Sequence, residues 1–306
     1  MQKPQSEWAK SMTFKEQLKV IKRLFVYAKP FRNTFIVAIL FAMALATINA
    51  FLPRILQTLI DRYLTNQTAT VQIILFFAML YLLGTILKAV IWFFQWYLYS
   101  SASLRSYQNI RVKLFEKLHT LGMRYFDQTP AGSIVSRVSN DTETLFEFWH
   151  VFLTVLTGIL AVISSFIAMF QINPKIATGI LFFLPILGFV IWYYQRFSSR
   201  VYRQMREKLS QLNTKLNESI SGMQIIQQFR QEKRFVKEFE KTNDEYLATR
   251  YAMIKMNSLL LGPIISLLYT FALGFALTAF GINALNSPVE VGLIYAFATY
   301  VQAFFN

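Results

Sequence analysis

Side chains that commonly carry enzyme chemistry are scarce in this sequence. It has two histidines, His119 and His150, and no cysteine, which excludes thiol catalysis, disulfides and cysteine-ligated metals within these 306 residues. The histidines lack metal-ligand spacing. No G-x-x-x-x-G-K-[ST] run occurs, so these residues hold no phosphate-binding P-loop. We expect no catalytic, metal or cofactor site within them, and read the histidines as helix-surface or interfacial residues.

The strongest remaining pattern is a break in each of two long, polar, helix-like stretches. In the first stretch, residues 130–132 (Pro-Ala-Gly) interrupt the helical pattern, and residues 139–141 offer N-caps for a returning helix. Ile134, Val135 and Val138 form a small apolar face there. We predict a helical hairpin that ends in this first tip (residues 118–145).

The second stretch has the same design. Gly222 interrupts the helical pattern, and the apolar cluster Ile225, Ile226 and Phe229 follows it. At this spacing Ile225 and Phe229 share one face of a short helix. Exposed apolar surface at such a second tip (residues 216–241) is typical of an interface with a partner. The alternative is that the two tips pack only on each other.

One basic residue, Lys88, lies inside an apolar stretch. A charge in the middle of a bilayer costs at least ~2.5 kcal/mol unless it is paired or hydrated. Lys88 either extends its ammonium group toward the membrane surface or lines a wet cavity with Trp92, Gln95 and Trp96, its neighbours one to two turns away.

Composition assigns the chain to the membrane. It is 55% hydrophobic and only 15% charged, against roughly 25% charged residues in soluble domains. The net charge of +15 fits basic loops that face anionic lipid better than a nucleic-acid-binding surface. We therefore expect lipid and no nucleic acid as a partner.

Six apolar segments are long enough, or nearly so, to cross a bilayer. They span about 34–52 (ending at Pro53), 71–99, 151–172, 176–194 and 258–282, with a sixth from near Val289. Asn173-Pro174 marks the turn between the third and fourth segments. The long connections, residues 97–148 and 196–257, are helical in pattern, so we expect the spanning helices to extend out of the membrane as arms of about 40 Å.

The basic residues set the expected orientation. Of the 31 lysines and arginines, 27 lie in the N-terminal tail and the two long connections. Because positive residues mark the cytoplasmic side, the N-terminus and both tips are expected inside a cell membrane. Residues 1–32 are expected to form a tail with an amphipathic helix on the membrane surface. Its apolar face would hold Phe14, Leu18, Ile21, Phe25 and Ala28, opposite Lys15, Lys19, Lys22, Arg23 and Lys29.

Several motifs together resemble the transmembrane domain of an ABC exporter of the multidrug and lipid type, most like one half of a Gram-positive heterodimeric multidrug exporter. They are RLFVYAKPFR, LPRILQTLIDRYL, LHTLGMRYFDQTPAGSIVSRVSND, ESISGMQIIQQFRQEKRFVKEF and VEVGLIYAFATYVQAFFN. The most specific is F-D-x-x-x-x-G-x-I-x-S-R-x-x-x-D, from Phe126 to Asp141. The resemblance covers essentially the whole chain.

The resemblance implies an all-α membrane fold of six helices (residues 33–306) with long intracellular extensions and helices exchanged between two halves. It also implies two coupling helices that dock on nucleotide-binding domains, the second on the domain of the opposite half. The matching positions in the first coupling region are Phe126, Asp127, Gly132, Ile134, Ser136, Arg137 and Asp141. Those in the second are Glu218, Gly222, Ile225, Ile226 and Phe229.

Family members continue into a nucleotide-binding domain that would bind ATP and Mg²⁺, whereas this sequence stops at Asn306, as a fragment or an isolated membrane domain would. The expected partners are therefore nucleotide-binding domains, a second half-transporter and a hydrophobic small-molecule substrate. The alternative function is a passive channel or receptor whose arms bind a regulator. No selectivity-filter or ion-ring pattern in the sequence favours that alternative.

Overall fold

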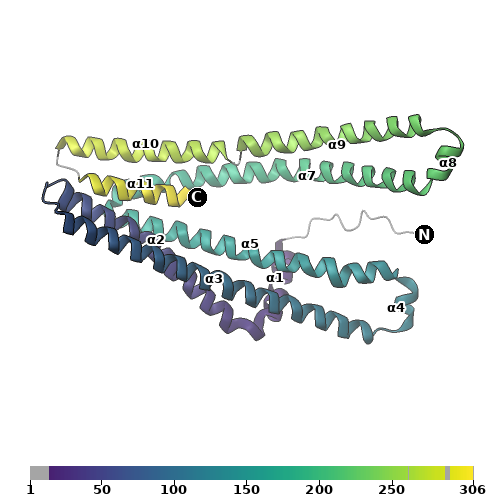
Figure 1. Ribbon diagram of the computed structural model, residues 1–306. Coiled ribbons are helices and arrows are strands. Elements are labelled where there is room, and N and C mark those ends of the chain that lie inside the picture. Colours follow the sequence, from purple (N-terminus) through teal and green to yellow (C-terminus); the bar gives the residue numbers. More distant parts are fainter. Residues whose placement is uncertain (1–13, 261, 287–289, 306) are drawn as a thin grey trace. The chain divides into compact units, whose positions relative to one another are not determined.

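A computed structural model describes residues 14–260, 262–286 and 290–305, and within these ranges the regular structure is helical with no strand (Figure 1). The elements of the first part are α1 (Phe14–Ala28), η2 (Lys29–Phe31), α2 (Arg32–Leu59), the π-helical turn η3 (Ile60–Leu64), α3 (Val71–His119), α4 (Met123–Gln128) and α5 (Ala131–Ile172). Those of the second part are α6 (Pro174–Leu181), α7 (Phe183–Ser221), α8 (Met223–Gln228), α9 (Glu232–Leu260), α10 (Pro263–Asn286) and α11 (Val291–Phe305).

The chain forms two compact units. Among the described residues, the first unit covers 14–167 and the second covers 168–305. Each unit contains one long helical hairpin. The first hairpin is α3–α4–α5, and the second hairpin is α7–α8–α9.

Five helical stretches are long and apolar enough to cross a membrane, which identifies a multi-pass membrane protein. They are residues 19–64, 71–119, 131–172, 174–221 and 232–285. The sixth apolar helix, α11, has 15 residues, fewer than the ~20 that a crossing needs. Its expected start, Val289, lies outside the described residues.

An aromatic cluster forms the core of the first unit, where α1, α2, α3 and α5 meet. Ala28, Phe35, Ala38, Tyr99, Ala102, Trp149 and Leu153 are all buried in it. The Tyr99 hydroxyl donates a hydrogen bond to the backbone carbonyl of Trp149 at 2.9 Å, and the Phe35 ring lies 5.0 Å from the Trp149 ring. These contacts tie the base of the first hairpin to the start of the first membrane segment.

The prediction that the first apolar helix ends at Pro53 was wrong. Helix α2 continues through Pro53 to Leu59, and the turn η3 extends it to Leu64. Proline removes one backbone hydrogen bond, but neighbouring helices sustain proline-containing helices in membranes. Leu52 packs so closely on α3 that a Cβ on Gly84 would lie 3.0 Å from its side chain. This packing holds the helix together across the proline.

The turn predicted at Asn173-Pro174 is confirmed. The Asn173 side chain accepts hydrogen bonds from the backbone N–H groups of Lys175 and Ile176, at 3.1 and 3.2 Å, and so caps α6. Two further breaks were not predicted. One lies at Phe182, three residues before Pro185, and the other precedes Pro263, where α9 gives way to α10. Both fit the loss of a backbone donor at proline.

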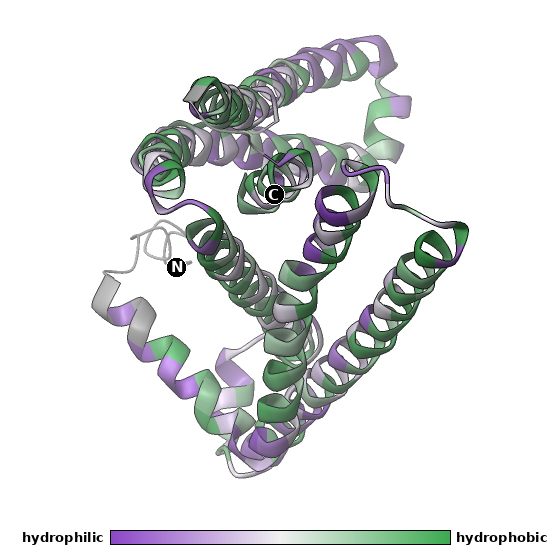
Figure 2. Ribbon diagram, turned by 90° about the vertical axis from the view of Figure 1, so that its left-hand side faces the viewer, coloured by the Kyte–Doolittle hydropathy of each residue, from purple (hydrophilic) through white to green (hydrophobic). Residues whose placement is uncertain are grey.

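Helix α1 is amphipathic, and polar and apolar residues alternate along it at the lower left of Figure 2. Leu24 and Ala28 are buried, whereas Phe25 is half exposed and packs edge-on against Trp149 at 5.4 Å. Leu24 was missing from the predicted apolar face. The side chains of Phe14, Lys15 and Leu18, which were included in the prediction, lie outside the described residues.

In the second unit, α11 packs on α10 through its aromatic side chains. Phe297 lies edge-on to Phe280 at 5.1 Å, and Phe305 lies 6.4 Å from Tyr269 and from Phe183. The short sixth helix is therefore a buried element of its unit.

Candidate functional site

The first tip is built around the six-residue helix α4. The descending helix α3 ends at His119, and the chain turns through residues 120–122 before α4 begins at Met123. A second turn at Thr129 and Pro130 leads into α5. The predicted break therefore comes earlier than expected, since Ala131 and Gly132 already belong to the returning helix. The predicted N-caps at residues 139–141 lie inside α5, so that assignment was wrong.

Because α5 begins at Ala131, the predicted residues of the first tip are divided between α4 and α5. Proline is favoured at the start of a helix, because its φ is already close to the helical value and the N–H groups of a first turn have no acceptor within the helix. Helix α5 therefore begins directly after Pro130. Phe126 and Asp127 lie on α4, and the other members of the set lie in the first three turns of α5: Gly132, Ile134, Ser136, Arg137 and Asp141. One contact joins the two parts, because the Arg137 guanidinium donates to the Tyr125 hydroxyl at 3.2 Å.

The first tip presents several apolar side chains to its surroundings. Met123 is 73% exposed, Val135 63% and Phe126 38%. Ile134 is only half buried. Surface of this kind at the end of a hairpin is suited to a protein partner.

The second tip turns at Gly222. Its backbone N–H donates to the carbonyl of Glu218 at 2.8 Å and closes α7. A Cβ at this position would lie 3.1 Å from that same carbonyl oxygen, so the turn favours glycine. The chain returns after α8 at Arg230, whose φ of 51° lies in the left-handed region. Nothing in the sequence signals this left-handed position, because arginine rarely adopts that conformation.

The three apolar residues of the second tip divide into two groups. Ile226 is buried, with 6% of its surface exposed, whereas Ile225 is 62% and Phe229 68% exposed. The Phe229 N–H donates to the Ile225 carbonyl at 3.0 Å, which places the two exposed side chains one helical turn apart. Ile226 thus fixes the tip, and Ile225 and Phe229 remain free to contact a partner.

An apolar hollow of about 230 Å³ lies between the end of α7, α8 and the start of α9. It is lined by Leu216, Ser219, Met223, Ile226, Glu232, Phe235, Val236 and Phe239. The α9 residues in this set were not predicted to belong to the tip. Their spacing of three to four residues, Glu232–Phe235–Phe239, was the available signal.

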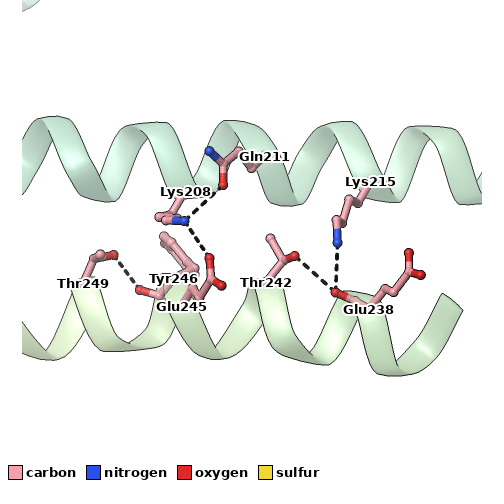
Figure 3. A network of polar contacts seen from close by, with 8 residues as sticks. All are labelled: Lys208, Gln211, Lys215, Glu238, Thr242, Glu245, Tyr246 and Thr249. Atoms are coloured by element: carbon pink, nitrogen blue, oxygen red, sulfur yellow. Dashed lines mark hydrogen bonds and ion pairs between the residues drawn. The ribbon is translucent and has the colours of Figure 1, made fainter. Parts of the chain in front are cut away.

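The helices of the second hairpin are joined by polar contacts along their length (Figure 3). Lys208 on α7 forms an ion pair with Glu245 on α9 at 2.6 Å and also donates to Gln211 at 3.3 Å. About two turns closer to the tip on α7, Lys215 donates to the backbone carbonyl of Glu238 at 3.1 Å. The hydrogen bond from Lys208, reinforced by its positive charge, lowers the pKa of the Glu245 carboxyl.

The first hairpin is held by aromatic and long side chains instead. The Trp96 ring lies 5.3 Å from His150, and the Tyr107 ring lies 6.3 Å from Phe146. Arg111 contacts the Tyr107 hydroxyl and donates to the backbone carbonyl of Ser139 at 3.5 Å. Within the described part of the chain, no ion pair joins α3 to α5.

The four candidates for a substrate cavity lie along α3 but do not share one environment. Gln95 is buried and Lys88 is half buried, while Trp92 and Trp96 are 58% and 47% exposed. Lys88 and Gln95 are seven residues apart and therefore lie on one face of the helix. No group of three metal-ligating side chains occurs among the described residues.

Comparison with known proteins gives a consistent result. Residues 35–306 match the family model described as the ABC transporter transmembrane region. The chain is 33% identical over 293 residues to the putative ABC transporter ATP-binding protein exp8 of Streptococcus pneumoniae, covering 95% of this chain and 50% of that protein.

Two further relatives agree. The multidrug resistance-like ATP-binding protein MdlB of Buchnera aphidicola is 30% identical over 286 residues, or 92% of this chain and 49% of that protein. The probable multidrug resistance ABC transporter ATP-binding/permease protein YheH of Bacillus subtilis is 33% identical over 220 residues, or 70% of this chain and 33% of that protein. The chain thus spans half or less of the length of these relatives.

Proposed function

Because this chain belongs to the family of ABC transporter transmembrane regions, we propose that it forms the membrane half of an ATP-driven exporter. Its substrates would be hydrophobic or amphipathic compounds, drugs or lipids, moved by alternating access. Several relatives carry multidrug resistance in their names, which supports this substrate class. The chain would lie in the cell membrane with a cytoplasmic N-terminus and would work with a second half-transporter.

The energy for transport would come from nucleotide-binding domains that bind ATP and Mg²⁺. The observation that carries the proposal is the pair of hairpin tips, each with apolar side chains exposed at the end of long helices. The helix α3 alone has 49 residues, which gives a length of roughly 70 Å at 1.5 Å per residue. A membrane crossing needs only about 30 Å of this length, so the remainder would extend into the cytoplasm and carry the tip to a nucleotide-binding domain.

In this assembly the second tip acts as the coupling contact. Ile225 and Phe229 would enter a cleft on the nucleotide-binding domain of the opposite half, while Ile226 keeps α8 folded beneath them. The first tip, including Phe126 and Arg137, would contact a nucleotide-binding domain in the same manner. Closure of the two domains would then move the helices through both tips.

Lys88 remains the candidate for a polar contact to substrate, with Gln95 on the same face of α3. The exposed Trp92 and Trp96 would face lipid or a second half-transporter.

The test is Phe229→Ala in the full-length transporter, reconstituted in liposomes. Phe229 is exposed, so its loss leaves the fold, substrate binding and basal ATP hydrolysis intact. Transport and the stimulation of hydrolysis by substrate should fall to background, because truncating a phenylalanine that becomes buried on docking costs about 3–5 kcal/mol.

Leu247→Ala is the matched control, since Leu247 is a 45% exposed apolar residue on the same hairpin but away from the tip. It should transport normally. Normal transport by Phe229→Ala would remove Phe229 from the coupling contact. Transport that continues without ATP hydrolysis would point to the passive channel instead.

A further inference from the structure

An apolar cleft lies between α1, the start of α2 and the base of the first hairpin, entirely within the first unit. Its volume is about 420 Å³, within the range of roughly 300–1,000 Å³ typical of small-molecule sites. Val26, Ile36, Ile39 and Phe152 form apolar walls, and Trp149 and Tyr99 also line it. The coupling tips and the substrate candidates on α3 take no part in it.

The charged side chains that line this cleft are all positive. Lys22, Lys29 and Arg32 line it, and no acidic residue does. Among the described residues none of these three cations forms an ion pair with a carboxylate. Three unpaired cations beside a cleft form a site for an anion.

The order of residues along α2 matches the anatomy of a phospholipid. Arg32 begins the helix, and Ile36 and Ile39 follow one and two turns later on the cleft. Arg32 and Ile39 are therefore separated by about 10 Å along the helix axis, going into the membrane segment. A molecule that filled the cleft would have its anionic end at the membrane surface and its apolar end in the hydrocarbon.

A buried hydrogen-bond donor supplies a second, independent observation. Trp149 lines the cleft and is only 1% exposed, and its indole N–H has no acceptor among the described residues. A buried donor without a partner destabilises the folded protein. An ester or phosphate oxygen of a bound lipid is a group that would accept this hydrogen bond.

We propose that this cleft binds one anionic phospholipid, with its phosphate between Lys22, Lys29 and Arg32 and one acyl chain along Ile36, Ile39 and Phe152. The bound lipid bridges α1 to α5 and steadies the base of the first hairpin. This site requires only that the chain resides in a membrane, and it is independent of the export function.

The test measures lipid binding by the full-length protein in a neutral detergent. Phosphatidylglycerol with brominated acyl chains is titrated, and quenching of tryptophan fluorescence is followed in a variant that keeps Trp149 and replaces every other tryptophan by phenylalanine, including the other four within these 306 residues. Brominated phosphatidylcholine serves as the neutral lipid. The thermal unfolding temperature of the unmodified protein is measured with the same lipids, so that the result does not depend on the tryptophan substitutions.

Phosphatidylglycerol should quench Trp149 at lower concentration than phosphatidylcholine and should raise the unfolding temperature more. Lys22→Gln with Lys29→Gln should weaken phosphatidylglycerol binding about 25-fold, since each basic residue near an anionic lipid contributes about 1 kcal/mol. The matched control is Lys19→Gln with Arg23→Gln, which removes the same charge from exposed positions of α1 outside the cleft. It should change binding less than about threefold, as expected from screened long-range attraction.

Ile39→Phe tests the apolar half of the site, because it adds bulk to the cleft without changing its charge and without adding a tryptophan. It should also abolish the preference for phosphatidylglycerol. Equal quenching by both lipids would overturn the proposal, as would equal losses in the cleft and control variants. Glycerol phosphate that competes as well as the intact lipid would also overturn it, because the acyl chain would then contribute nothing.

Discussion

In the second hairpin, α7 and α9 lie against each other and are joined by side-chain contacts along their length (Figure 1). In the first hairpin, α3 and α5 lie farther apart, and close approaches of their backbones are rare among the described residues. The two hairpins share a design of long helix, six-residue tip helix and long helix. They differ in what holds the helices together.

The second hairpin is held together by contacts between its own helices. Tyr194 donates to Asn257 at 2.9 Å near the membrane segments, Lys208 pairs with Glu245 farther out, and Ile226 fills the tip. The first hairpin depends on its base, where Tyr99 and Trp149 meet, and on α1. The Lys113 ammonium lies over the Tyr27 ring of α1 at 5.5 Å. The first hairpin should therefore be sensitive to changes in α1, and the second should not.

Both tips are expected on the cytoplasmic side of the membrane, and labelling of single introduced cysteines tests this with an all-or-none result. The chain contains no cysteine, so Gln128→Cys and Gln227→Cys each introduce a single thiol at a tip. Both should react with an impermeant maleimide only after the cells are opened. Ala69→Cys, in the turn after η3, should react in intact cells. A tip that is labelled in intact cells would show that the two tips do not both lie on the cytoplasmic side.

The largest effect on stability is expected within the second tip, where two adjacent isoleucines differ in burial. Ile226→Ala should destabilise the tip by about 2–5 kcal/mol, because it removes a buried side chain and leaves a cavity. Ile225→Ala should change stability by less than about 0.5 kcal/mol, because this side chain is exposed. Hydrogen exchange of the α8 amides measures both. Equal effects would mean that the two residues share one environment.

Much of this arrangement followed from the sequence, and the exceptions have physical causes. The membrane segments follow from long apolar runs, and the second tip follows from Gly222. The predicted end at Pro53 was wrong because packing on α3 carries α2 past the proline. The start of α5 was misplaced because residues 139–141 are good N-caps, yet Pro130 starts the helix two turns earlier.

The sequence pattern also could not separate Ile225 from Ile226. Both are equally apolar and adjacent, and Ile226 is the one that lines a hollow together with Phe235 and Phe239 of α9. Local spacing does not specify this packing between helices. The cleft at α1 was missed for a similar reason. Its walls come from α1, α2, α3 and α5, and no local spacing connects Lys22 to Trp149.

A smaller effect is expected at the base of the first hairpin. Tyr99→Phe removes the hydrogen bond to the Trp149 carbonyl and should lower stability by about 0.5–1.5 kcal/mol. Tyr97→Phe is the control, because Tyr97 is 60% exposed on the same helix. Thermal unfolding in detergent compares the two. If they behave alike, the hydrogen bond contributes nothing to the hairpin's stability.

The smallest effect is expected from the ion pair of the second hairpin, and pH reveals it. Lys208 lowers the pKa of Glu245 below its ordinary value of 4.5, so the folded protein favours the ionised carboxylate. The resulting stabilisation is fully present above pH 4.5 and is lost as the pH falls through the lowered pKa of the folded state.

Glu245→Gln keeps an acceptor for Lys208 but removes this titration. The variant should therefore be slightly less stable than the parent at neutral pH, and the difference should shrink on acidification below pH 4.5. Glu240→Gln on the same helix is the control, since Glu240 is exposed and forms no ion pair among the described residues. Its difference from the parent should not show this pH dependence.

Because the Lys208–Glu245 pair is partly exposed, high salt should reduce its stabilising effect as well, whereas the aromatic contacts of the first hairpin should resist changes in both pH and salt. A first hairpin that responds to pH as strongly as the second would mean that charge, and not ring packing, holds α3 to α5.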